Sequence, residues 1–128
     1  VLIDVLIEDP LFARPSEAAI ANALAAGEVV VCDAVVAELQ AMLDTTVNVM
    51  ETLDSLGIRH QPGSEQAAVR AGLMLKRFRA RGGKRERVVP DFLIGAHALL
   101  QCSALITRDD GFFRDYFKGL KVIVPKAS

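Results

Sequence analysis

The chain has 128 residues, with 15 Lys and Arg against 16 Asp and Glu, two His, two Cys and a formal charge of -1. This length predicts a single domain over residues 1–128, because a chain of this size can bury one core. The charge excludes a uniformly basic nucleic-acid binder and an acidic disordered tail. No apolar run approaches the roughly 18 residues of a membrane span, and no signal-peptide pattern is present. With Cys32 and Cys102 both in apolar segments, we expect reduced thiols and a cytoplasmic protein without a membrane partner.

Short β-branched runs alternate with amphipathic helices along the chain. Strands are predicted over residues 1–7, 28–32, 104–107 and 121–124. Helices are predicted over 17–26, 34–43, 45–56, 64–79, 92–101 and 112–117, with Ser16, Asp33 and Ser64 as N-terminal caps. Met42, Met50 and Met74 are expected to fill the core. The alternation predicts an α/β domain with a mainly parallel four- or five-stranded sheet and helices on both faces.

Four acids stand out by their surroundings. Asp4 interrupts an apolar run, Glu38 borders an apolar helix stripe, Asp91 precedes an apolar helix and Asp109 follows a buried strand. Burying several carboxylates together without a cation is prohibitive. Oxygen ligands suit Mg²⁺ or Mn²⁺, whereas the few, widely spaced His and Cys residues do not form a zinc-binding pattern. The acids therefore suggest metal-assisted phosphodiester hydrolysis.

Each acid also has a purely structural interpretation. Asp91 is a suitable helix cap, and Asp109 is a suitable turn residue before Gly111. Glu38 could be an ordinary surface residue, since it lies at the edge of its apolar stripe. Asp4 is the hardest to explain structurally, because central strands disfavour Asp.

Several segments together resemble PIN-domain ribonucleases, and above all the VapC-type toxins of toxin–antitoxin pairs. The matching segments are VLID, VVAEL, PDFLIGAHA, ALITRDDGFFRDYF and KVIVP. The resemblance implies a PIN-like three-layer α/β/α fold and places the family's acidic tetrad on Asp4, Glu38, Asp91 and Asp109, with Thr107 in support. It further implies a Mg²⁺- or Mn²⁺-dependent endoribonuclease that is restrained by a VapB-type antitoxin and forms a homodimer.

The sequence departs from the family pattern after Asp4. The family usually continues with Thr or Ser and then Asn, whereas Asp4 is followed directly by Val5, Leu6 and Ile7. A true deletion at this point would shorten the loop beside the metal site. It would also put the reach of Asp4 and the activity in question.

A basic stretch, KRFRARGGKRER at residues 76–87, carries a local charge of +6 and leads into Asp91. Such a cluster can neutralise phosphates, so Arg81, Lys84, Arg85 and Arg87 are predicted to contact RNA. A solvated helix end, with basic residues favoured by the helix dipole, is the alternative. The aromatic residues at 112–117 are expected to pack in a core or dimer interface more than to stack on bases, and His97 is expected to be structural.

Other functions remain open at this stage. A PIN nuclease of RNA maturation would lack an antitoxin, and a degenerate PIN domain would bind partners without cutting. A receiver-like phospho-acceptor module is a third possibility, although the sequence lacks its acidic pair after the first strand and its later Lys.

Overall fold

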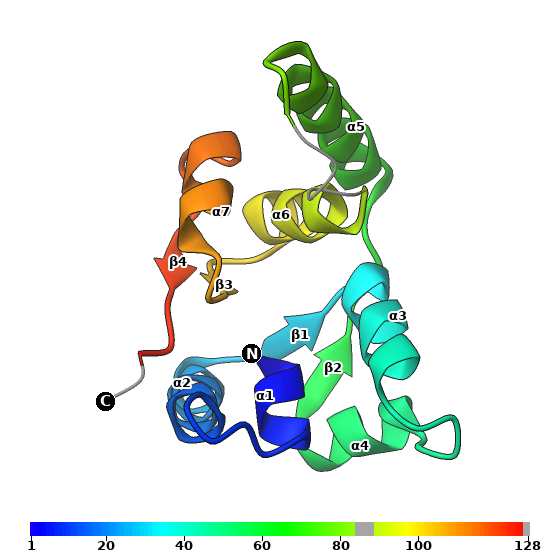
Figure 1. The fold of residues 1–128 in the computed structure, drawn as a ribbon, viewed down its shortest axis with the longest axis vertical. Coiled ribbons are helices and arrows are strands. Elements are labelled where there is room, and N and C mark those ends of the chain that lie inside the picture. Colours follow the sequence, from blue (N-terminus) through cyan, green and yellow to red (C-terminus); the bar gives the residue numbers. More distant parts are fainter. Residues whose placement is uncertain (84–88, 127–128) are drawn as a thin grey trace.

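The computed structural model describes residues 1–83 and 89–126 (Figure 1). Helices and strands alternate along this part of the chain, which confirms the predicted α/β class. The elements are α1 (Leu2–Leu6), α2 (Ala13–Ala26), β1 (Val29–Val31), α3 (Asp33–Met42), α4 (Val49–Ser55), β2 (Ile58–His60), α5 (Glu65–Ala80), α6 (Val89–Gln101), β3 (Leu105–Ile106), α7 (Asp110–Tyr116) and β4 (Val122–Ile123).

The strands form two parallel pairs. β1 pairs with β2 in the register Val29 to Ile58, and β3 pairs with β4 in the register Leu105 to Val122. The parallel pairing agrees with the prediction. The four strands do not join into one sheet, however, because hydrogen bonds divide them into two sheets of two strands. One of these strands, β2 at Ile58–His60, lies outside the strands predicted from the sequence.

The first seven residues do not form the predicted strand. Residues 2–6 form the short helix α1, in which the amide of Ile7 donates to the carbonyl of Ile3 at 2.9 Å. A short, continuously apolar run suits a buried strand or a buried helix equally well. Here the apolar side chains of α1 pack against the core beside α2 and α3, so the helix satisfies the same burial.

Only one of the three predicted N-terminal caps is present in the structure. Ser64 caps α5 as predicted, with its hydroxyl accepting from the amide of Ala67 at 3.1 Å. Ser16 is no cap, because α2 begins three residues earlier and Ser16 is fully buried inside it. Asp33 is the first residue of α3 and makes no side-chain cap. Asn48 caps α4, so this helix begins later than the predicted start at residue 45.

Two hydrophobic cores hold these elements together. One lies among α1, α2, α3, α4, β1 and β2, and includes Ile20, Leu39 and Leu53. The other lies among α5, α6, α7, β3 and β4. Met74 fills the second core as expected, whereas Met42 and Met50 are exposed. No helix within the described residues is both long and apolar enough to cross a membrane.

Aromatic rings build the second core around α6. The Phe92 ring is fully buried, and its centroid lies 5.6 Å from that of Phe78 and 5.2 Å from that of Phe112 in edge-to-face contacts. Phe117, at 1% exposure, packs against Gly95 of α6. The expectation that the aromatic residues of 112–117 pack in a core is thus confirmed, because Phe112, Phe113 and Phe117 are buried in it and Tyr116 packs against it.

Gly95 allows the close approach of Phe117 to α6. A Cβ atom at Gly95 would lie 2.3 Å from Cε2 of Phe117, so Gly95→Ala should destabilise the fold by about 1–3 kcal/mol through overpacking. Gly72→Ala in α5 is the matched control, because a Cβ there meets nothing within 4 Å. It should stabilise by up to about 1 kcal/mol through helix propensity. Urea unfolding measures both, and equal effects of the two substitutions would contradict the packing.

Candidate functional site

Two of the four predicted acids are brought together by helix packing. α3, which carries Glu38, packs against α6, which carries Asp91. Partial burial raises the pKa of Glu38, and the negative charge of Asp91 raises it further. The two carboxylates therefore repel one another across the contact between α3 and α6.

The position of Asp91 is fixed by the residue that follows it. Asp91 lies in the first turn of α6, and the neighbouring Phe92 has no exposed surface. Because the Phe92 ring is enclosed by aromatic neighbours, the first turn of α6 has little freedom to shift. Asp91 is thus held at the surface end of a rigid element, as a metal ligand or a catalytic carboxylate requires.

Asp109 lies where β3 meets α7. Thr107 continues the ladder beyond β3, with its amide donating to the carbonyl of Ile123 at 3.0 Å. The hydroxyl of Thr107 accepts from the amide of Asp109 at 3.1 Å, and Asp109 is the N-cap residue of α7. The predicted supporting residue Thr107 therefore contacts the backbone amide of Asp109, and not its carboxylate, through this hydrogen bond.

Asp4 occupies a different setting from the one predicted. It lies within α1, and not at the end of a strand, with only 3% of its surface exposed. Its Oδ2 atom accepts from the hydroxyl of Ser16 at 3.3 Å and lies 3.4 Å from Nε of Arg108. The buried charge is thus already balanced by protein groups, a possibility that the sequence did not reveal.

The donor chemistry of the acids suits a hard divalent cation, because carboxylate oxygens are the ligands that Mg²⁺ and Mn²⁺ prefer. A cation between Glu38 and Asp91 would also relieve their repulsion. Among residues 1–83 and 89–126, however, no three His, Cys, Asp or Glu side chains are grouped so as to hold a metal ion. Convergence of the full predicted tetrad therefore stays a prediction.

The basic stretch is described only in part. Arg81 ends α5, and its guanidinium lies 5.6 Å from the centroid of the Tyr116 ring, so it extends along the aromatic core. Lys84, Arg85 and Arg87 lie outside the described residues. The RNA contacts predicted for Arg81 and for these three residues therefore stay a prediction.

Comparison with known proteins identifies the family. The model of the PIN domain matches residues 1–118, nearly the whole chain. The chain belongs to the PIN-domain family. Among solved structures, VapBC-1 from nontypeable Haemophilus influenzae is similar, with a TM-score of 0.67 and 20% identity over 96% of this chain and 92% of that one. VapBC2 from Rickettsia felis, bound to a DNA fragment from its promoter, gives a TM-score of 0.57 and 19% identity over 77% and 75%. No curated protein matches the sequence.

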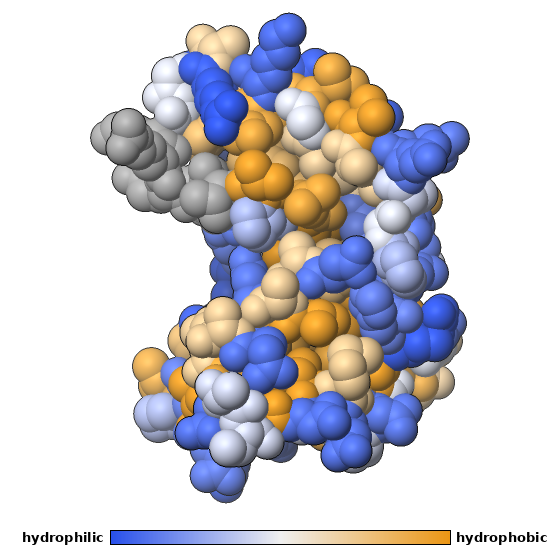
Figure 2. All heavy atoms as spheres, turned by 90° about the vertical axis from the view of Figure 1, so that its right-hand side faces the viewer, coloured by the Kyte–Doolittle hydropathy of each residue, from blue (hydrophilic) through white to orange (hydrophobic). Residues whose placement is uncertain are grey.

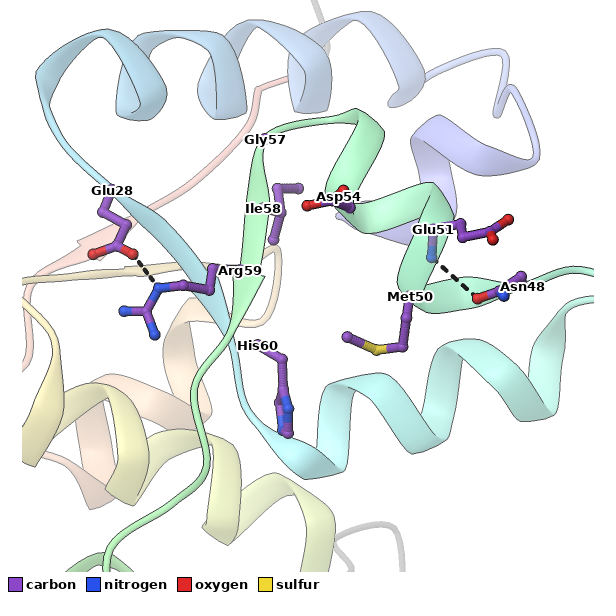
Figure 3. A pocket seen from close by; sticks show the side chains of 9 residues that line it. All are labelled: Glu28, Asn48, Met50, Glu51, Asp54, Gly57, Ile58, Arg59 and His60. Carbon is purple, nitrogen blue, oxygen red and sulfur yellow. Dashed lines mark hydrogen bonds and ion pairs between the residues drawn. The ribbon is translucent and has the colours of Figure 1, made fainter.

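An open pocket of this PIN domain lies away from the acids. It has a volume of about 730 Å³ and lies beside β2 and α4 (Figure 3). Figure 3 shows Arg59 paired with Glu28 at its wall, and the Oδ1 atom of Asn48 accepts from the amide of Glu51 at 3.1 Å. None of the four predicted acids lines this pocket. This pocket is therefore separate from the predicted acidic site.

His97 of the PIN domain is a buried structural residue, as predicted. It is 5% exposed, and its Nδ1 atom lies 3.8 Å from Sγ of Cys102. Within residues 1–83 and 89–126, no hydrogen-bond partner of its Nε2 atom is found. Burial lowers its pKa. Cys32 is buried and Cys102 half-buried, both as free thiols. His97 lies six residues after Asp91 on α6, whereas Cys32 directly precedes α3 and Cys102 directly follows α6.

The repulsion between Glu38 and Asp91 predicts a pH-dependent gain of stability on removing one charge. Because the folded-state pKa of Glu38 is raised, its favourable contribution is present below the unfolded pKa of 4.5 and is lost as the pH rises through the folded value. Without metal at pH 7, Glu38→Gln should raise the melting temperature by roughly 1–2 °C, a small effect because Glu38 is only partly shielded from solvent. The gain should vanish at pH 4.

Glu17→Gln is the control for this experiment, since Glu17 is exposed on α2, away from α6. Thermal unfolding followed by circular dichroism at both pH values measures the four cases. A gain for Glu38→Gln that persists at pH 4, or an equal gain for Glu17→Gln, would contradict the repulsion.

Proposed function

We propose that this PIN domain is a Mg²⁺- or Mn²⁺-dependent endoribonuclease that acts as the toxin of a toxin–antitoxin pair. The observation that carries the proposal is the pair of mutually repelling carboxylates, Glu38 and Asp91, on neighbouring helices of a PIN domain. The similarity of the fold to two VapBC structures supports the toxin assignment.

Three acids are proposed to serve the metal directly. Asp91 and Asp109 would hold the cation, and Glu38 would ligate it or orient the attacking water. The bound cation would activate that water and stabilise charge on a phosphoryl oxygen. Asp91 and Asp109 are presented by the starts of α6 and α7, so rigid elements carry them. For Asp4, the fourth acid of the predicted tetrad, we propose an indirect role, because its carboxylate is buried and paired with Arg108.

The basic stretch is proposed to bind the RNA substrate. Residues 76–87 carry a charge of +6 and end shortly before Asp91. Arg81, Lys84, Arg85 and Arg87 would neutralise phosphates on either side of the bond to be cut, which gives sequence-independent and salt-sensitive affinity. The attraction would offset the repulsion between RNA and the acidic site.

Exposed apolar side chains support the proposed protein partners, a VapB-type antitoxin and a second copy of the chain. Figure 2 shows hydrophobic residues at the surface in both the upper and the lower half of one face. On α5 and α6, Val69, Leu73 and Leu100 line an open groove of about 540 Å³. Leu73 is 55% exposed. Contiguous exposed apolar residues of this kind mark protein–protein contacts, and we propose that this groove forms the homodimer interface.

A catalytically degenerate PIN domain is the second candidate. The observation that favours it is the absence, within the described residues, of a three-residue group arranged to hold a metal ion. Such a protein would bind an antitoxin-like partner without cutting RNA. The metal titration that follows distinguishes the two candidates.

Cation binding should stabilise the native state by mass action. At ten times the dissociation constant, Mn²⁺ should add about 1.4 kcal/mol, or roughly 5 °C in melting temperature. Asp91→Asn should abolish this shift and RNA cleavage together, whereas Asp54→Asn, an exposed residue of α4, should change neither. Thermal unfolding with and without Mn²⁺, and cleavage of a single-stranded RNA, provide the readouts. An unchanged melting temperature of the wild type without cleavage would favour the degenerate alternative.

The proposed dimer interface is tested by placing a charge in its groove. Leu73→Glu should convert a dimer into a monomer, because an unpaired carboxylate cannot be buried against a second copy. Met50→Glu, at a similarly exposed position on α4, should leave the dimer intact. Size-exclusion chromatography with light scattering measures both masses. Dissociation by Met50→Glu alone would place the interface on α4.

A further inference from the structure

Arg108 lies at the junction that carries Asp109. On its amino-terminal side, the backbone of Thr107 is hydrogen-bonded to Ile123 beside β4, and on its carboxyl-terminal side Asp109 begins α7. The hydroxyl of Thr107 spans Arg108 to accept from the amide of Asp109. Any displacement of Arg108 would therefore shift the backbone of Asp109 as well.

The side chain of Arg108 extends from this junction to a socket that is formed by Asp4 of α1 and by Phe12, which directly precedes α2. Its Nε atom lies 3.4 Å from Oδ2 of Asp4. Its guanidinium carbon lies 3.9 Å from the centroid of the Phe12 ring, a cation–π contact. Asp4 is 3% exposed and also accepts from the fully buried Ser16. The Oδ2 atom of Asp4 thus contacts both the hydroxyl of Ser16 and the guanidinium of Arg108.

The aromatic wall of the socket is held equally firmly. The Oδ1 atom of Asp9 accepts from the amides of Leu11 and Phe12, each at 2.9 Å. The hydrogen bond from the Phe12 amide lowers the pKa of Asp9 most, and that from the Leu11 amide lowers it further. The positive charge of Arg108 makes a smaller contribution in the same direction. A charged Asp9 therefore fixes the backbone of Phe12 and adds a second anion near the guanidinium.

The contact joins two parts of the molecule that have separate cores. α1 and α2 belong to the core that contains Ile20 and Leu53, whereas β3 and α7 belong to the aromatic core around Phe92. Arg108 extends from the second part to a buried anion in the first. Arginine suits this contact, since its planar guanidinium can stack on a ring while it pairs with a carboxylate, which lysine cannot do equally well.

We propose that Arg108 is a positioning residue, which fixes Asp109 for metal binding by anchoring the β3–α7 junction to Asp4 and Phe12. The role in metal binding rests on the proposed function, whereas the anchoring does not. Asp4 then acts through Arg108 and makes no contact with the metal. The ion pair with Arg108 gives the buried carboxylate of Asp4 a role within α1, without any contact with a metal ion.

The anchoring is tested without metal or RNA by amide hydrogen exchange. Arg108→Ala should speed exchange of the amides at residues 107–117, while the amides of α5 stay unchanged. Arg114→Ala is the matched control, because Arg114 pairs with Asp110 at 2.8 Å on the exposed face of α7. Unchanged exchange at 107–117 in Arg108→Ala, or an equal increase in Arg114→Ala, would overturn the anchoring.

The effect on the metal is tested by Mn²⁺ titration followed by calorimetry. Arg108→Ala should weaken Mn²⁺ binding by about tenfold or more, as is usual when a residue that orients a ligand is removed. Arg108→Lys should recover part of this loss, since the charge opposite Asp4 is kept. Arg114→Ala should bind like the wild type. Equal Mn²⁺ affinity of the wild type and Arg108→Ala would overturn the positioning role.

A double-mutant cycle decides between an indirect and a direct role of Asp4. Asp4→Asn alone should weaken Mn²⁺ binding, but it should add less than about twofold in the Arg108→Ala background, because coupled residues are not additive. A further full loss in that background would show that Asp4 is itself a ligand and would overturn this part of the proposal. If the wild type bound no Mn²⁺, the proposed metal function and the positioning role would both fail, whereas the exchange experiment would still decide the anchoring.

Discussion

The burial of α6 is the constraint on which the rest of the structure depends. This helix contacts α5, α3 and β3, and it reaches them because its inward side carries Gly95, Ala96 and the fully buried Phe92. Small residues allow neighbouring elements to approach, and the single large ring fills the space among the other aromatic residues. One consequence is chemical. The same packing brings Asp91, one residue before Phe92, close enough to Glu38 for its negative charge to raise the pKa of that carboxyl.

A near-neutral chain can bind RNA if its charges are separated along the sequence. The +6 segment at residues 76–87 leaves the remainder of the chain at -7, and part of that excess is gathered where Glu38 faces Asp91. Repulsion between two neighbouring carboxylates raises the free energy of the metal-free fold, and a bound cation would remove that repulsion. Asp4 is a carboxylate in a different setting, because Arg108 pairs with its charge and the hydroxyl of Ser16 donates a hydrogen bond to it.

Local signals in the sequence located most of the helices and three of the four strands, β1, β3 and β4, but they missed β2 and the division into two sheets. The helix from Ser64 onward was predicted because its capping residue is a local signal, which does not depend on distant residues. β2 is only three residues long, so it carries little pattern of its own. Ile58–His60 forms a strand because Val29–Val31 lies beside it. Pairing between distant segments is a tertiary effect that no local pattern contains.

The acids of the candidate site could likewise be selected from local sequence, whereas a contact between distant residues could not be predicted. Composition and context selected Glu38, Asp91 and Asp109 from the sequence, because carboxylates beside apolar segments are unusual wherever they fold. The partner of Asp4 could not be found in this way, since Arg108 is more than a hundred residues away along the chain. Its own neighbours, Asp109 and Asp110, are the acids with which the sequence alone would pair it. The apolar run around Asp4 suggested a strand, and a strand suggested a position at the sheet edge with the other acids. Once that run is a helix, the inference no longer holds, and the contact with Arg108 becomes the reason for burying the charge. Asp4 was thus selected correctly for its burial and assigned to the wrong element, which is why its role has to be derived from its partners.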